Sequence, residues 1–367
     1  MVCTRHTDGA FDRGWMLTST AETPTQRTTS ARLDWVDAAK GLSILLVVLH
    51  HTVWYLQRSG QAPAAVIAAN EALASLRMPL FFLASGLFVA GPLAASWRTV
   101  LHKRIALFVY LYVIWTIIRF TFFATVVPPE VDPDDSANPL EFALALLLPG
   151  PSMWFLYALA VFAVVAKLMR RLPVWVQLGA TGVLSALVGA EMVEFGDTRW
   201  TYMSRFLFFF LLGCRGRHLV ERLAQATGLL RVVAASAVCV GAAGAAVVFG
   251  VRTIPGVALA LQCLAVGFGV LFAAWIARYR IGRPLVVLGQ QTLPIYLTHM
   301  LWLAAIMIGV RHIDFPPVAE YALPLVMVPV LTVLSLLTHR VLVSAGATWL
   351  FAMPSRLAYR APQRPGV

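Results

Sequence analysis

Two adjacent histidines, His50 and His51, lie inside a long apolar stretch that begins near Lys40. An α-helix turns about 100° and rises about 1.5 Å per residue, so Lys40 and His51 share one face and stand roughly 16 Å apart along the axis. A titratable ring within a membrane helix is costly and usually faces a protein interior or a wet cavity with a function. We therefore predict that His51 is a working residue. The alternative is a histidine that only makes a hydrogen bond between helices.

Three arginines, Arg77, Arg119 and Arg205, also lie within apolar stretches. An arginine at the centre of a membrane helix costs roughly 2.5–3.5 kcal/mol on insertion scales, so each needs an anion or a wet cavity. Their positions along the predicted membrane spans place Arg77 and Arg205 at about the same membrane depth as His51. Trp154 begins another span on the same side of the membrane. These side chains could line one cavity reachable from outside. Snorkelling to the interface is the alternative for Arg77 and Arg205, and an intramembrane ion pair is the interpretation for Arg119.

A second polar face appears in the segment GQQTLPIYLTHM, residues 289–300. Tyr296 follows Thr292 by four residues and His299 follows it by seven, so a helix places the three side chains on one face. His299 is a second candidate proton carrier, and Tyr296 is a candidate substrate contact. An interhelical hydrogen bond is the alternative for His299.

A basic cluster is expected where Lys40 begins its helix, because Lys103 and Arg104 close the next loop on the same side. Clustered Lys and Arg suit phosphate groups, and a coenzyme A thioester would meet them from the cytosol. The alternative is simple anchoring of the protein by positive charge.

The composition is that of a membrane protein rather than of a soluble core. Of 367 residues, 59% are hydrophobic and 13% are charged, and the mean hydropathy is +0.77. A helical span needs about 20 mostly apolar residues. We predict an all-α fold, a polytopic transmembrane helical bundle of about ten spans. The predicted spans are about 40–56, 75–93, 105–127, 152–169, 174–190, 200–214, 229–250, 255–277, part of 285–310 interrupted at Pro294, and 321–343.

The net charge of +12 could suggest a nucleic-acid partner, but its distribution argues against one. With the N-terminus in the cytoplasm, 22 Lys and Arg residues fall on the cytoplasmic side and 4 on the outer side. Such a bias over short loops sets orientation, so both termini are predicted to be cytoplasmic. The basic patches then serve topology and anionic lipid. The four cysteines have neither metal nor disulfide spacing, and no metal site or bound cofactor is predicted.

Three segments follow from this pattern. Residues 1–31 are polar, lack the apolar core of a signal peptide, and are predicted to be a disordered cytoplasmic tail. Residues 32–345 form the transmembrane domain, and 346–367 form a cytoplasmic C-terminal tail. Within the domain, PPEVDPDDSANP is predicted to be a loop, followed by a short interfacial helix over 140–149.

Six blocks, in order, resemble the acyltransferase-3 family of integral membrane O-acyltransferases, which modify sugars of surface and exported glycans. The resemblance covers about residues 32–300. The blocks are the run from Asp37 through Lys40 to His51, MPLFFLASG at 78–86, KRIALFVYLYVIW at 103–115, MWFLYAL at 153–159, RFLFFFLLGC at 205–214 and LGQQTLPIYLTHM at 288–300.

The resemblance implies an acyl-CoA donor entering from the cytosol and an acceptor hydroxyl on an extracytoplasmic sugar. It implies His51 as the catalytic histidine and Lys40 in the place of the family's usual Arg, with the charge kept and the bidentate fork lost. His50 stands where a small or aromatic residue is more usual, so which histidine acts stays open, as does the choice between proton acceptor and acyl carrier. Arg77 and Arg205 could stabilise an oxyanion or hold an acidic acceptor.

The alternative function, from another class, is a transporter or flippase for a sugar-lipid or small anionic substrate. Transporters often carry repeats with interrupted helices at matching positions in both halves. Here the interruptions at Pro79 and Pro294 have unrelated sequence contexts, which argues against a transporter or flippase.

Overall fold

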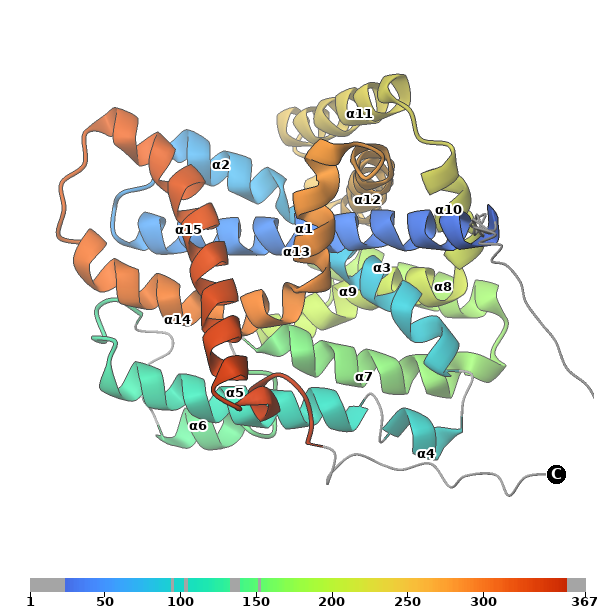
Figure 1. Ribbon diagram of the computed structural model, residues 1–367. Helices are drawn as coiled ribbons and strands as arrows, with labels where there is room; N and C mark the ends of the chain where they lie inside the picture. Colours follow the sequence, from blue (N-terminus) through green and yellow to red (C-terminus); the bar gives the residue numbers. More distant parts are fainter. Residues whose placement is uncertain (1–23, 94–95, 102–104, 133–138, 151–152, 355–367) are drawn as a thin grey trace, which may run out of the picture.

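The computed structural model describes residues 24–93, 96–101, 105–132, 139–150 and 153–354. Every regular element in these ranges is a helix (Figure 1). The α-helices are α1 (Pro24–Arg58), α2 (Ala64–Ala72), α3 (Ala74–Leu93), α4 (Trp97–Val100), α5 (Ala106–Thr125), α6 (Pro139–Ala145), α7 (Trp154–Leu168), α8 (Val174–Gly189), α9 (Thr198–Arg215), α10 (Arg217–Gln225), α11 (Leu229–Val248), α12 (Val257–Ile276), α13 (Arg283–Gln290), α14 (Thr292–Val310) and α15 (Pro317–Ser344).

The predicted fold class, an all-α membrane bundle, is confirmed. Seven stretches of the described chain are long and apolar enough to cross a bilayer; they lie on α1, on α2 with α3, and on α5, α11, α12, α14 and α15. The other three predicted spans coincide with α7 (15 residues), α8 (16 residues) and α9 (18 residues). The first two are short, and α9 carries three arginines, so the total of ten remains a prediction.

Helix α1 runs through the whole bundle, and α13 crosses it (Figure 1). Helix α1 also packs on α3, α12, α14 and α15. The crossing with α13 is backbone to backbone, because Gly41 faces the Leu285 carbonyl and Gly289 faces the Asp37 carbonyl without room for a Cβ atom. This close approach holds α13 against the part of α1 that carries Lys40.

We expect Gly289→Ala to destabilise the protein, because an added methyl group would collide with the α1 backbone at Asp37. Overpacking of this kind costs about 1–3 kcal/mol. Gly244→Ala is the matched control, since a Cβ at this α11 position has nothing within 4 Å. Thermal unfolding in detergent should show a lower midpoint for Gly289→Ala and an equal or higher one for the control. Equal midpoints for both variants would contradict the close packing.

The structure corrects the predicted boundaries in three places. Helix α1 begins at Pro24, within the predicted disordered tail, because proline suits the first position of a helix and no Gly or Pro follows it within residues 25–31. The stretch left between the first two predicted spans, residues 57–74, contains α2. The interruption predicted at Pro294 falls instead at Gln291, between α13 and α14, since a proline in the first turn of a helix forfeits no intrahelical bond.

The first part of the predicted C-terminal tail is packed onto the bundle. The short helix Thr348–Leu350 lies against α5, where Trp115 Nε1 donates to the Leu350 carbonyl at 2.6 Å. The Phe351 ring also packs on Trp115, with ring centres 5.7 Å apart. The described first part of residues 346–367 thus lies against α5.

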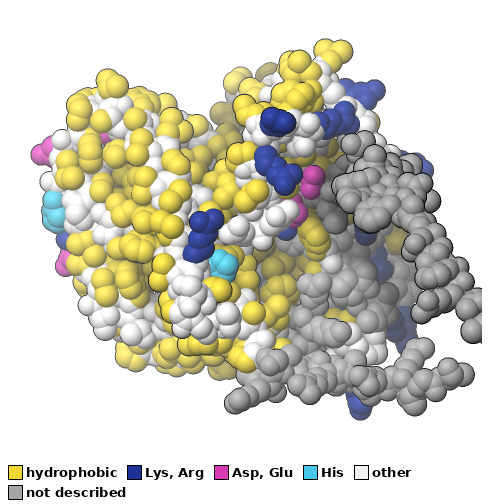
Figure 2. Space-filling view, viewed as in Figure 1, with side chains coloured by type: hydrophobic (Ala, Val, Ile, Leu, Met, Phe, Trp, Pro, Cys, Tyr) yellow, Lys and Arg dark blue, Asp and Glu magenta, His cyan; other side chains and the backbone are white. Residues whose placement is uncertain are grey.

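Hydrophobic side chains cover most of the face shown in Figure 2. The edge of this face toward the ends of α1 and α14 carries acidic and histidine side chains and little Lys or Arg, whereas Lys and Arg are more frequent toward α10. A broad apolar surface of this kind suits contact with lipid tails.

Candidate functional site

The centre of the candidate site is a pair of histidines from helices far apart in the sequence. His51 Nδ1 on α1 lies 3.1 Å from His299 Nε2 on α14, and the ring centres are 5.2 Å apart. His299 is 1% exposed, so the contact is closed to bulk solvent on that side. The structure thus brings together the two histidines that the sequence singles out separately.

The proton positions of this pair follow from one fixed partner. His299 Nδ1 lies 2.8 Å from the Ile295 carbonyl, which only accepts, so this nitrogen carries a proton. A neutral His299 then presents a lone pair at Nε2, because a second proton would place a cation deep in an apolar bundle. His51 Nδ1 must therefore donate to it, and His51 Nε2 is left with a lone pair. His51 is the ring of this pair that can accept a proton from another molecule.

The neighbouring His50 belongs to a different hydrogen-bond chain. Arg77 Nη1 donates to Asn70 Oδ1 at 3.2 Å, and Asn70 Nδ2 lies 3.2 Å from His50 Nδ1. Asn70 is 7% exposed and Arg77 is 6% exposed, so the chain is buried. It joins α1, α2 and α3 beside the histidine pair, and the rings of His50 and His51 are 5.2 Å apart.

The other predicted site residues occupy three different settings. Tyr296 lies one turn before His299 on α14, with 6.3 Å between the two ring centres. Trp154 packs in an aromatic group with Phe82, Tyr202 and Phe206. With the Gln262 amide turned so that its oxygen faces the guanidinium, Arg205 Nε donates to it at 2.9 Å. Tyr296 therefore joins the histidine pair, whereas Arg205 is bound to α12.

Arg119 is 6% exposed and lies on α5. Its guanidinium stacks on the Phe123 ring at 4.3 Å. It also interacts electrostatically with both histidines of the pair. Its positive charge is thus part of the surroundings of the site.

A mainly apolar cavity of about 260 Å³ reaches from Lys40 to Tyr296. At its charged end Lys40 Nζ contacts Asp37 Oδ1 at 2.8 Å, and Gln290 Nε2 donates to the other Asp37 oxygen at 3.3 Å. Lys103 and Arg104, predicted beside Lys40, lie outside the described residues. The cavity is lined by Lys40, Phe81, Ser85, Phe88, Val89, Phe108, Phe155, Leu156, Leu159, Thr292, Leu293 and Tyr296.

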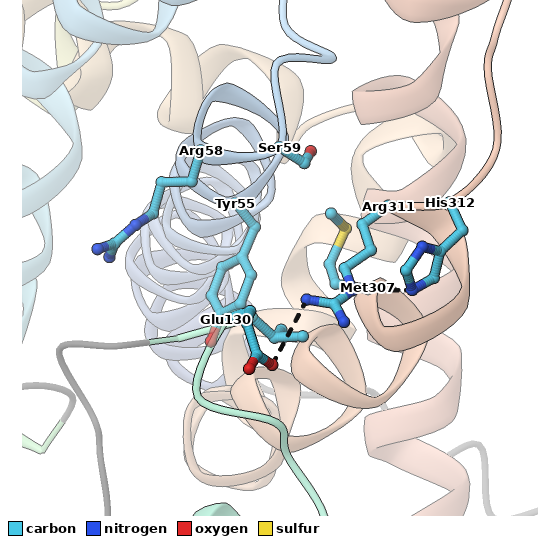
Figure 3. A pocket seen from close by; sticks show the side chains of 8 residues that line it. Tyr55, Arg58, Ser59, Glu130, Met307, Arg311 and His312 are labelled. Atoms are coloured by element: carbon cyan, nitrogen blue, oxygen red, sulfur yellow. Dashed lines mark hydrogen bonds and ion pairs between the residues drawn. The ribbon is translucent and has the colours of Figure 1, made fainter.

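A second, more polar cavity of about 380 Å³ lies at the opposite ends of α1 and α14 (Figure 3). Tyr55 lines it and donates to Asp132 Oδ2 at 2.5 Å. Arg311, at the end of α14, faces Glu130 from the loop after α5 at 4.0 Å, while Arg58 points away from this pair (Figure 3). Sequence reasoning did not single out Tyr55 or Asp132. Their pairing joins positions 77 residues apart and has no local signal.

The two cavities lie on either side of the histidine pair. Tyr55 follows His51 by four residues on α1, and Tyr296 precedes His299 by three residues on α14, so each cavity begins about one helical turn from the pair. The two helices run in the same direction, since Lys40 and Thr292 line the first cavity and the later residues Tyr55 and Met307 line the second. The His51–His299 pair thus lies between an apolar cavity and a polar one.

Comparison with known proteins places this architecture in a family. A family model described as an acyltransferase domain matches residues 33–339. The chain belongs to the acyltransferase-3 family. The match contains α2 to α14 entirely, together with the described contacts of both histidines. The acyltransferase-3 resemblance of the sequence is confirmed, and the protein is a multi-pass membrane protein of this family.

One curated relative is similar to part of the chain. Over 157 residues the chain is 29% identical to the inner membrane protein YcfT of Escherichia coli (strain K12), covering 38% of this chain and 44% of the relative. The chain thus spans under half the length of the curated relative it matches. No solved structure matches the chain.

Asn70 is the site residue that sequence reasoning missed. It lies in the stretch left between the first two predicted spans, although it is an amide within the largely apolar run AAVIAANEALA. An amide in such a run is costly to bury unless it is hydrogen-bonded, and this cost is the signal that could have identified it.

Proposed function

We propose that this acyltransferase-3 protein is an O-acyltransferase that moves an acyl group, acetyl or succinyl, from acyl-CoA to a hydroxyl of an extracytoplasmic sugar or glycan. His51 acts as the catalytic base. The observation that carries the proposal is the position of the His51–His299 pair between two cavities of different chemistry.

The apolar cavity suits the acyl-CoA donor. Lys40 at its entrance offers a cation for phosphate, and Phe81, Leu159 and Tyr296 line the way toward the histidines. The thioester arm of coenzyme A is long and weakly polar, so an apolar passage through the membrane fits it. The nucleotide part stays outside, where further basic residues, Lys103 and Arg104 among them, are proposed to meet it.

The polar cavity suits a sugar acceptor. Tyr55 and Ser59 supply hydroxyl groups, while Glu130 and Arg311 supply charged acceptors and donors for sugar hydroxyl groups. Of the predicted substrate contacts, Tyr296 lies by the histidines at the end of the donor cavity, and Trp154 and Arg205 are proposed to act on the acceptor from helices α7 and α9.

The proposed reaction is one proton-coupled acyl transfer. The proton of the acceptor hydroxyl moves to His51 Nε2 while the oxygen of that hydroxyl attacks the thioester carbonyl. His299 accepts the Nδ1 proton of His51 as a hydrogen bond and so stabilises the imidazolium that forms. Arg77 adds positive charge near the developing oxyanion. The C–S bond then breaks, and the departing thiolate takes the proton from His51, leaving an ester, coenzyme A and neutral His51.

We also propose the orientation in the cell membrane. The bias of Lys and Arg to one side of the predicted spans supports cytoplasmic termini. In this orientation the cavity at Lys40 opens toward the cytosol, where acyl-CoA is made, and the cavity at Tyr55 opens outward.

Donor turnover by purified protein tests the proposal. Protein in nanodiscs is incubated with radiolabelled acetyl-CoA or succinyl-CoA, and release of coenzyme A is measured with and without a mixture of sugars. Release that rises with acceptor is the expected result. A folded protein that neither binds nor turns over either donor would contradict the proposal and favour transport, which substrate uptake into proteoliposomes would then measure.

Lys40→Ala is expected to raise the KM for acyl-CoA, because the cavity loses its cation at the entrance. A charge-assisted contact contributes about 1.5–3 kcal/mol, or roughly 10–150-fold in binding. Lys40→Arg keeps the charge and should stay near the parent value. Initial rates over a donor concentration series separate the two variants. An unchanged KM in Lys40→Ala would show that the donor does not meet this residue.

A further inference from the structure

The two neighbouring histidines of α1 are held in opposite tautomers. His51 donates from Nδ1 to His299 and so keeps its lone pair at Nε2. His50 is bound in the reverse sense, since Asn70 Nδ2 can only donate and His50 Nδ1 must therefore accept. A neutral His50 then carries its proton at Nε2. One ring offers a base at Nε2 and the other offers an N–H group.

Arg77 determines which side-chain atom of the Asn70 amide is the oxygen and which is the nitrogen. A guanidinium only donates, so the Asn70 atom that it contacts at 3.2 Å must be the oxygen. The Asn70 nitrogen is then turned toward His50. Both Asn70 and Arg77 are more than nine-tenths buried, which holds this arrangement in place. Arg77 thereby fixes the tautomer of His50 through Asn70, which contacts both residues.

We propose that His50 is a second catalytic group, whose Nε2–H donates a hydrogen bond to the oxyanion of the transferred acyl group, with Asn70 as its positioning residue. This inference rests on the proposed O-acyl transfer. The His50 ring lies beside the proposed base, with 5.2 Å between ring centres, so its N–H is within reach of a carbonyl under attack at His51. As negative charge moves onto the thioester oxygen, this donor stabilises it, and no proton is transferred.

A pair of His50 variants tests this role. His50→Gln keeps an N–H donor on a side chain of similar reach, whereas His50→Leu removes the donor and keeps the bulk. Loss of one oxyanion donor costs about 10²–10³-fold in kcat, and we expect this loss for His50→Leu with little change in KM, while His50→Gln retains most of kcat. Asn70→Leu should lower kcat as well. His339→Gln, at the far end of α15, is the control.

Given an active parent, equal kcat in His50→Leu and the parent would overturn the inference, and so would equal losses in His50→Gln and His50→Leu. An inactive parent would instead contradict the proposed function. The two failures are therefore distinguishable.

Solid-state ¹⁵N NMR of histidine-labelled protein tests the tautomers without using activity. Spectra of His50→Gln and His51→Gln identify the signals by their loss. The expected result is a proton on Nε2 for His50 and on Nδ1 for His51. In Asn70→Asp a carboxylate accepts in place of the amide donor, so His50 Nδ1 should gain a proton. A proton on Nδ1 of His50 in the parent would overturn the inference.

Discussion

His51→Ala is expected to lower the rate of acyl transfer by about 10²–10⁴-fold, the contribution typical of a positioned general base. The reason is geometric. In the His51–His299 pair, hydrogen bonding leaves the proton-accepting lone pair on His51 Nε2. Acyl-CoA binding should be almost unchanged, because neither cavity is lined by His51. Single-turnover rates and equilibrium binding of radiolabelled acyl-CoA measure the two effects separately.

The same variant distinguishes a base from an acyl carrier. A carrier histidine would take the acyl group from the donor and hold it until an acceptor arrives. Parent protein quenched with radiolabelled donor and no acceptor should carry no label if His51 is a base. If the parent protein carries label and His51→Ala does not, His51 is an acyl carrier and not a general base.

His299→Leu is the second variant with a large expected effect. It leaves the Nδ1–H of His51 without an acceptor in a buried position, so His51 is free to move its proton to Nε2 and lose its basic lone pair there. Holding a catalytic histidine in the wrong tautomer costs about 10⁴-fold in a serine protease, and we expect about 10²–10³-fold here.

His299→Gln is the matched control for this variant. A glutamine oxygen can accept from His51 Nδ1, so this variant should recover much of the lost rate in kcat measurements. If both His299 variants lose the same activity and unfold at the parent temperature, His299 does not act by holding His51. Equal, parent-like activity in both would remove it from the site altogether.

The sequence anticipated the parts of the site that depend on local periodicity. Lys40 and His51 lie along one helix, and Tyr296 and His299 lie about one turn apart on another, as 3.6-residue spacing requires. The meeting of His51 with His299 joins positions 248 residues apart. Such a contact depends on how α1 and α14 pack, which no local pattern encodes.

Arg205 shows the limit of an argument from depth. Its position along α9 fixes how deep it lies, but not which way it points. The structure turns it toward Gln262 on α12, which offers it an amide oxygen at 2.9 Å. Asn70 shows the opposite case, because a polar residue between the first two predicted spans lies in α2 and holds His50. Burial of polar side chains was therefore harder to predict than the helices themselves.

The most direct test of the whole account is acyl transfer across a bilayer. Parent protein is reconstituted in one orientation in sealed proteoliposomes, with radiolabelled acyl-CoA on the side of Lys40 and a sugar acceptor on the side of Tyr55. We predict labelled sugar ester on the acceptor side and free coenzyme A on the donor side, with both lost in His51→Ala. Ester formed only when donor and acceptor share one side, or sugar crossing the bilayer unmodified, would contradict it.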